Sequence, residues 1–222
     1  MTYTSIKICG LTREADVDCA VQAGVNAIGF VLYFKSARYV SAERAAQLSL
    51  RLPSFVSPVL LYVNASEEEV ISSAKQVPGA WLQFHGDESP EFCLRVAQSL
   101  GRRWIRAARI PDPSPSGQAP FDLVKYALDY SQANALLLDT HVEGYGGGGK
   151  TFNWSLLPLS VNAHLVLSGG LTPANVGDGI RALHARGLSL SVDVSSGVES
   201  AKGIKDPHKI RQFVEAVRST VL

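Results

Sequence analysis

The chain has 222 residues, of which 46% are hydrophobic and 18% charged, and its formal net charge is +1. This composition supports a folded domain with a sizeable core, and it argues against a basic nucleic-acid-binding surface. No apolar stretch reaches the length of a membrane span, and the N-terminus lacks the basic-then-apolar pattern of a signal peptide. Three cysteines, an odd and small number, predict no disulfide framework and a reducing, cytoplasmic environment.

A short apolar strand, a turn and an amphipathic helix alternate along the chain. The predicted strands are Ile6–Cys9, Ala27–Leu32, Val59–Val63, Ala80–His85, Trp104–Ile110, Ala135–Asp139, His164–Leu167 and Leu190–Val194. The predicted helices are Arg13–Ala23, Ala42–Arg51, Glu67–Val77, Pro90–Leu100, Phe121–Tyr130, a short piece near Trp154–Leu157, Pro173–Ala185 and His208–Val221. Four of these helices follow a residue suited to the N-cap, namely Thr12, Ser41, Ser66 or Thr172.

Eight strands that alternate with eight helical segments predict a parallel α/β protein, and we expect one (β/α)8 barrel over residues 1–222. A doubly wound sheet is the alternative. It usually has fewer strands, and for a nucleotide it needs a glycine-rich turn after its first strand. The turn Cys9-Gly10-Leu11-Thr12 is not that motif. The Pro- and Ser-rich segment Pro111–Pro120 is predicted to be one surface loop, and no linker divides the chain.

Two glycine-containing turns follow the seventh and eighth predicted strands. The first includes Ser168, Gly169 and Gly170, and the second includes Ser195, Ser196 and Gly197. Small residues leave backbone N–H groups accessible, and a glycine allows a phosphate to approach closely. If the sheet closes, the two turns form one anion site, and the chain binds a small phosphorylated molecule. Otherwise they are two ordinary strand-to-helix turns.

Alternation of side chains along each strand predicts which residues point into the barrel. With the apolar residues facing the helices, the inward residues that come together are Cys9, Gln83, His85, Asp139 and Asp193. All but Gln83 lie near the carboxyl ends of their strands, and Lys7 points inward lower in the first strand. Barrel active sites lie at this end. The convergence of a thiol, an imidazole and two carboxyls therefore predicts a catalytic site.

Several of these residues also have a purely structural interpretation. Cys9 is either a small buried hydrophobe or a thiolate stabilised by the helix that follows it. Asp139 could cap the next turn, and His85 could be a core histidine, with no second ligand at metal-binding spacing. Lys7 either forms a Schiff base or pairs with Asp193, the latter being the more usual arrangement.

Arg38 and the remaining cysteines also leave alternatives open. Arg38 lies in the loop after the second predicted strand, where it is either solvated or an anion clamp. Cys19 and Cys93 fall within predicted helices, and we interpret both as packing residues.

Taken in order along the chain, these motifs resemble the phosphoribosylanthranilate isomerase family of tryptophan biosynthesis. The resemblance rests on segments spread over nearly the whole length: Lys7–Thr12, Gly29–Val31, Lys35–Arg38, Gln83–Gly86, Leu137–Thr140, Gly146–Trp154, Leu167–Leu171 and Asp193–Glu199. It implies a (β/α)8 barrel without cofactor or metal that acts on a small phosphorylated substrate, as a monomer or a homodimer.

Carried over by position, the resemblance implies that Cys9 is the general base and Asp139 the general acid of an Amadori rearrangement. Arg38 matches the arginine that holds the anthranilate carboxylate. Gln83, His85 and Asp193 match positions that line the site, and the Ser168–Gly170 and Ser195–Gly197 turns match the phosphate site. Two departures are visible: Gly146–Gly149 is glycine throughout, and Phe84 replaces the usual aliphatic residue.

This mechanism requires an Asp139 pKa above the reference of about 3.9 and a Cys9 pKa below about 8.5. Three other functions compete with it. An indole-forming synthase usually has extra N-terminal structure and several inward lysines. A histidine-pathway isomerase would use an aspartate where this chain has Cys9, and a non-catalytic phosphosugar-binding protein would not need a paired acid and base.

Overall fold

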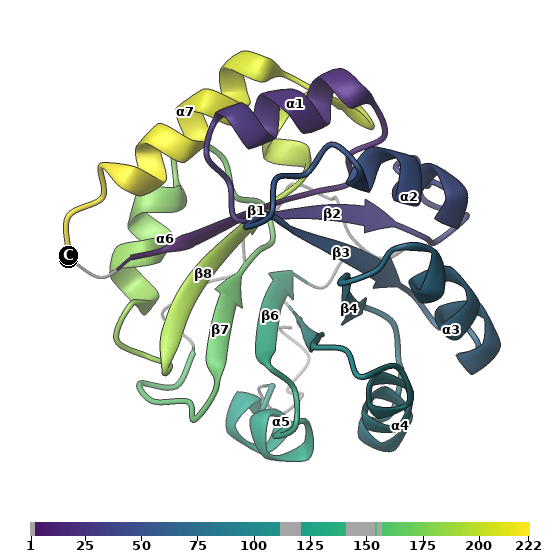
Figure 1. Ribbon diagram of the computed structural model, residues 1–222. Helices are drawn as coiled ribbons and strands as arrows, with labels where there is room; N and C mark the ends of the chain where they lie inside the picture. The colour runs from purple at the N-terminus through teal and green to yellow at the C-terminus, as the bar shows by residue number, and fades with distance from the viewer. Residues whose placement is uncertain (1–2, 112–120, 141–153, 155–156) are drawn as a thin grey trace.

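The computed structural model describes residues 3–111, 121–140, 154 and 157–222, and within them eight parallel strands close into one barrel in chain order (Figure 1). The strands are β1 (Ser5–Cys9), β2 (Ala27–Val31), β3 (Ser57–Tyr62), β4 (Trp81–Phe84), β5 (Trp104–Ile110), β6 (Ala135–Thr140), β7 (His164–Leu167) and β8 (Ser189–Val194). The predicted (β/α)8 fold is confirmed, because β1 pairs with both β2 and β8.

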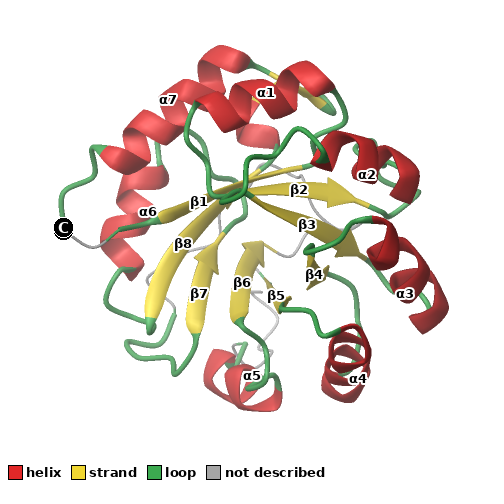
Figure 2. Cartoon of the chain, in the orientation of Figure 1, coloured by secondary structure: helices red, strands yellow, loops and turns green. Residues whose placement is uncertain are grey.

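Helices lie around the outside of the strands (Figure 2). They are α1 (Glu14–Gln22), α2 (Ala42–Ser49), α3 (Glu67–Gln76), α4 (Pro90–Leu100), α5 (Leu123–Asp129), α6 (Val176–Leu183) and α7 (Pro207–Arg218). Within the described ranges, none of them has the length and apolar character needed to cross a membrane. Residues 112–120 of the predicted surface loop, the Gly146–Gly149 run and residues 155–156 of the helix predicted near Trp154 lie outside the described residues.

Two of the four predicted N-caps are confirmed. The side chain of Ser41 accepts a hydrogen bond from the Arg44 N–H at the start of α2. At α3, Ser66 and Glu69 form a reciprocal capping box that satisfies two backbone donors of the first turn.

The other two cap predictions are wrong, because both helices begin later than expected. The helix α1 starts at Glu14, and the Thr12 hydroxyl donates instead to the Gly203 carbonyl. The helix α6 starts at Val176 after a tight turn, in which the Asn175 side chain accepts a hydrogen bond from the Thr172 N–H. In both cases an extra turn separates the strand from its helix. The presence of a capping residue in the sequence does not predict this turn.

The alternation predicted for the strands places the core in two layers. Ile6, Ile8, Leu136 and Leu138 belong to the large cluster between strands and helices. A second cluster fills the barrel interior and consists of Ile105, Ala107, Ala135, Leu137 and Val166, packed by Trp81. Cys9 belongs to a third cluster with Val31, Leu61 and Val63. The apolar inner side chains of these two smaller clusters therefore pack against one another across neighbouring strands.

A short 3₁₀ turn (Ser196–Val198) and a two-stranded hairpin, β9 (Glu199–Ala201) with β10 (Ile204–Lys205), separate β8 from α7. We predicted no strand in this segment. Strands of three and two residues are too short for a period-two pattern to be recognised.

Phe84, the residue that departs from the usual aliphatic, is fully buried between β4 and the helices. Its ring lies 6.0 Å from the ring centroids of both Phe92 and Trp104 and 6.3 Å from that of Tyr62. Because its removal leaves a cavity in this cluster, we expect Phe84→Ala to lower the free energy of unfolding in urea by about 3–5 kcal/mol.

The matched control is Leu128→Ala on α5, where the side chain is 68% exposed. We expect a change within about 0.5 kcal/mol there. Equal losses in the two variants would contradict the packing role of Phe84.

Candidate active site

Four polar side chains converge at the carboxyl end of the barrel, as predicted. Cys9 ends β1, His85 directly follows β4, Asp139 lies near the end of β6, and Asp193 lies near the end of β8. All four are less than 9% exposed. Strand closure therefore brings a thiol, an imidazole and two carboxyls from distant parts of the sequence to one end of the molecule.

Cys9 lies beside a buried ion pair. The Lys7 ammonium donates to Asp193 Oδ1 at 2.8 Å, which confirms the predicted pairing. A Cβ placed on Gly29 of the neighbouring strand would lie 2.7 Å from Cys9 Sγ and 3.0 Å from Lys7 Nζ. The thiol and the ammonium thus both occupy the space above Gly29, which only a residue without a side chain leaves open.

The environment of the Cys9 thiol differs from the one expected from sequence. Burial raises the pKa of Cys9, and the nearby Lys7 ammonium opposes that rise. The expected help from a helix dipole is small, because α1 begins only at Glu14, beyond the turn that follows β1. Lys7, and to a smaller extent Lys205, are the positive charges that favour the thiolate here. The pKa of Lys7 is itself raised because Asp193 and Cys9 outweigh its burial.

Asp139 is held by two hydrogen bonds. Its Oδ2 lies 3.0 Å from His85 Nε2, and its Oδ1 accepts from the Thr140 backbone N–H at 2.9 Å. On the other side of the imidazole, Gln83 Nε2 lies 3.1 Å from His85 Nδ1. The inward-facing residues of β4 and β6 therefore form a continuous buried chain from Gln83 through His85 to Asp139.

The two glycine-containing turns lie against each other. A Cβ on Gly197 would stand 1.8 Å from the Leu171 carbonyl oxygen, so no side chain can be accommodated where the turns meet. Gly169 and Gly170 have φ angles of +74° and +63°, a conformation that favours glycine. The two turns that follow β7 and β8 are therefore in contact at neighbouring strand ends.

Serine side chains join these turns to the polar residues of the mouth. Ser195 Oγ donates to the Cys9 carbonyl at 3.0 Å, and Ser168 Oγ lies 3.5 Å from Asp193 Oδ2. Ser196 and Gly197 begin the 3₁₀ turn, rather than a long helix, after β8. The predicted phosphate turn and the predicted base are therefore joined by a direct hydrogen bond.

Arg38 is buried, so its interpretation as a solvated side chain is wrong. Its Nε and Nη2 donate to the two Glu199 carboxylate oxygens at 2.7 and 2.8 Å, and these bonds raise the pKa of the guanidinium. A Cβ on Gly10 would lie 2.5 Å from Arg38 Cδ, which places the side chain directly over the residue after Cys9. Arg38 is therefore a buried, ion-paired side chain beside the mouth.

Glu199 and Lys205, both on the β9–β10 hairpin, were not predicted as part of the site. Lys205 Nζ donates to Glu199 Oε1 at 2.8 Å and to the Ser195 carbonyl at 3.0 Å. Burial would raise the pKa of Glu199, but the Arg38 and Lys205 hydrogen bonds outweigh it and lower the pKa. Because both residues lie on the short hairpin, only their nearness to the Ser195 turn in sequence could have drawn attention to them.

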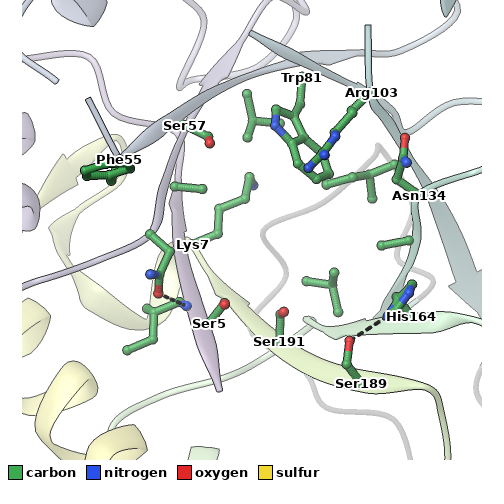
Figure 3. Close-up of a pocket in the computed structure, with 17 residues that line it drawn as sticks. Ser5, Lys7, Phe55, Ser57, Trp81, Arg103, Asn134, His164, Ser189 and Ser191 are labelled. Carbon is green, nitrogen blue, oxygen red and sulfur yellow. Dashed lines mark hydrogen bonds between the residues drawn. The ribbon is translucent and has the colours of Figure 1, made fainter. Parts of the chain in front are cut away.

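A cavity of about 580 Å³ opens at the opposite, amino end of the barrel (Figure 3). Several of its polar groups form hydrogen bonds to residues of the strands. Asn26 accepts from the Ile6 N–H, Asn134 accepts from the Trp104 N–H, and His164 bonds to Ser189. Such an arrangement at this end indicates a role in stability rather than catalysis. Among the described residues no cluster of three or more His, Cys, Asp or Glu could hold a metal ion.

The chain matches known proteins over nearly its whole length. A family model described as N-(5'-phosphoribosyl)anthranilate (PRA) isomerase matches residues 6–216. An N-(5'-phosphoribosyl)anthranilate isomerase of Methylibium petroleiphilum is 56% identical over 215 residues, which cover 97% of this chain and 94% of that protein.

Solved structures agree with this match. The crystal structure of phosphoribosyl anthranilate isomerase from Thermotoga maritima is 38% identical, with a TM-score of 0.82 and coverage of 97% of this chain and 99% of that one. A second isomerase structure, in complex with reduced 1-(o-carboxyphenylamino)-1-deoxyribulose 5-phosphate, is 34% identical, with a TM-score of 0.77 and coverage of 97% and 99%. With this fold, this arrangement of residues and these matches, the chain belongs to the phosphoribosylanthranilate isomerase family.

Proposed function

We propose that this chain catalyses the Amadori rearrangement of N-(5'-phosphoribosyl)anthranilate in tryptophan biosynthesis, in the cytoplasm and without a cofactor. Family membership and the 56% identical relative of that name support the reaction. The observation that carries the assignment of residues is the convergence of Cys9 and Asp139 at the barrel mouth, next to two touching glycine turns.

In the proposed mechanism, Asp139 gives a proton to the ring oxygen of the ribose, and the ring opens to an iminium. The iminium acidifies the hydrogen on the adjacent carbon, and the Cys9 thiolate removes it. The enolamine that results tautomerises to a 1-deoxyketose. After its proton has left, the Asp139 carboxylate accepts from the Thr140 N–H and faces His85 Nε2, and these contacts stabilise the charge.

The two anionic ends of the substrate are proposed to be fixed separately. The phosphate binds the Ser168–Gly170 and Ser195–Gly197 turns, which lie in contact. The anthranilate carboxylate binds Arg38, whose Nη1 is not one of the two donors used by Glu199. Glu199 holds the guanidinium plane in one orientation, so that Arg38 is ordered before the substrate arrives.

We expect Cys9→Ala and Asp139→Asn each to lower kcat by a factor of about 100 or more, because each removes one partner of the proton transfers. Substrate binding should be largely kept. The change in anthranilate fluorescence during turnover of synthetic substrate measures both kcat and KM. Cys19→Ser, on the outer helix α1, is the matched thiol control and should keep normal turnover. Near-normal kcat in Cys9→Ala or Asp139→Asn would remove that residue from its role.

Arg38→Ala should raise KM by about 10–100-fold. The reason is that a charge-assisted hydrogen bond to the substrate carboxylate contributes about 1.5–3 kcal/mol to binding. We expect kcat to change much less, because Arg38 binds a part of the substrate that does not react. Steady-state kinetics on both variants would test this, with Arg44→Ala on α2 as control, since Arg44 pairs with Glu14 near the protein surface. An unchanged KM in Arg38→Ala would contradict the clamp.

The chain is proposed to act as a monomer or a homodimer, and the amino end of the barrel is the surface to test. Phe55 is 96% exposed there and borders the 580 Å³ cavity (Figure 3). One solved Thermotoga maritima structure is of monomers generated from a dimeric phosphoribosylanthranilate isomerase. If light scattering gives a dimer mass, we expect Phe55→Glu to convert it to a monomer. A dimer that survives this substitution would exclude this end as the interface.

A further inference from the structure

Lys205 is a buried lysine that the proposed mechanism does not use. It lies on β10, the second strand of the short hairpin, and its side chain is completely buried. Lysine is almost never fully buried unless its ammonium has specific partners. The partners of this ammonium therefore indicate what the residue does.

The ammonium of Lys205 is surrounded by oxygen atoms. It donates to Glu199 Oε1 at 2.8 Å and to the Ser195 carbonyl at 3.0 Å, and it lies 3.3 Å from Ser195 Oγ. The Ser195 hydroxyl gives its single hydrogen to the Cys9 carbonyl, so its oxygen accepts from Lys205. All the donors of the ammonium are thus used, and two of the three hold one residue of the second glycine-containing turn.

The bond to the Ser195 carbonyl sets the direction of the next backbone donor. The carbonyl of Ser195 and the N–H of Ser196 belong to one planar trans peptide group, so they point in opposite directions. On the carbonyl side, Lys205 is completely buried, whereas Ser196 and Gly197 are partly exposed. The Ser196 N–H is therefore directed away from the buried ammonium.

The same ammonium leaves this part of the mouth with one positive charge in excess. Arg38 and Lys205 share the single carboxylate of Glu199. A buried cation is unfavourable unless a negative charge compensates for it. An anion that binds beside this cluster would supply the missing charge.

Two other carboxylates that lie nearby are already paired with cations of their own. On α1, Asp16 pairs with Arg13, and it meets Lys205 only through a bond from the backbone N–H. On β8, Asp193 pairs with Lys7. The Cys9 thiol, whose pKa is raised by burial, is not a permanent negative charge. The excess charge thus favours an anionic ligand.

We propose that Lys205 is a positioning residue for phosphate binding, which holds the Ser195 carbonyl so that the Ser196 N–H is aimed at the phosphate of the substrate. Because the phosphate site belongs to the proposed function, the role of Lys205 rests on that function. Glu199 bonds to both Lys205 and Arg38. One carboxylate therefore supports the residues that hold the two anionic ends of the substrate.

Loss of the Lys205 ammonium should weaken phosphate binding while the chain stays folded. In Lys205→Met the Glu199 carboxylate still pairs with Arg38, so no buried charge is left alone. We expect the dissociation constant of inorganic phosphate to rise at least about tenfold, because an aligned donor to a charged group is lost. In steady-state kinetics, KM should rise by a similar factor, with kcat within about threefold of wild type.

The Ser196 amide reports phosphate binding directly by NMR. Ser72–Ser73 and Ser195–Ser196 are the only Ser–Ser pairs in the sequence, so serine labelled with ¹³C at the carbonyl and with ¹⁵N gives two linked amide signals, which Ser73→Ala tells apart. Phosphate should shift the Ser196 signal saturably and leave that of Ser73, on α3, in place. Lys205→Met should shift the Ser196 signal even without phosphate, because the carbonyl of the same peptide group loses its hydrogen bond.

The matched control is Lys209→Met on α7. Lys209 donates to the Glu199 backbone carbonyl at 2.7 Å, so the variant removes the same charge from a lysine that supports the same hairpin. We expect its phosphate affinity and KM to equal those of wild type. Equal losses in the two variants would assign the effect to charge or to hairpin stability and refute the role of Lys205. A phosphate dissociation constant within about twofold of wild type in Lys205→Met would also refute it.

Binding and activity are measured separately, so the two proposals can fail separately. If wild type shows no isomerase activity but binds phosphate in a way that depends on Lys205, the proposed function fails and the role of Lys205 stands. If active wild type shows no shift of the Ser196 signal with phosphate, the role of Lys205 fails, whatever the variants show, and the proposed function stands.

Discussion

Closure of the parallel sheet is the constraint on which the whole molecule depends. Because β1 pairs with both β2 and β8, every strand has two neighbours and only two directions remain for its side chains. One direction enters the apolar layer under the helices, and the other enters the barrel. The polar residues at the ends of these strands are therefore placed by the register of the sheet.

Buried charges at the mouth are arranged so that each has a partner. Lys7 is paired with Asp193, and Arg38 and Lys205 share Glu199. A lone buried charge would be strongly unfavourable, but a pair with good hydrogen bonds is tolerated and can be used to control a neighbouring group. The Lys7 ammonium shows this use, because it opposes the rise that burial causes in the pKa of the Cys9 thiol.

The sequence-based predictions were correct where they used the alternation of side chains along a strand, which holds over the whole strand. Strand alternation correctly placed Lys7, Cys9 and Asp193 inside the barrel and correctly predicted the Lys7–Asp193 pair. It failed where short-range geometry decides the outcome. The turns before α1 and α6 displaced two predicted caps, and the β9–β10 hairpin was too short to be recognised.

The burial of Arg38 illustrates a second limit of sequence reasoning. Whether an arginine in a loop is solvated depends on what folds back over it, and here that is Glu199, 161 positions further along the chain. No local pattern around Arg38 contains this information. The raised pKa of Cys9 could not be predicted for the same reason, since it depends on burial by residues from other strands and on the distance to the first helix turn.

The hydrogen bond from the Ser195 hydroxyl to the Cys9 carbonyl has a mechanical consequence. It ties the loop after the last strand to the tip of the first strand, at the seam where the two ends of the sheet meet. A displacement of that loop is therefore transmitted to the backbone that carries the thiol. This single bond joins two residues across the seam that lie 186 positions apart in the sequence.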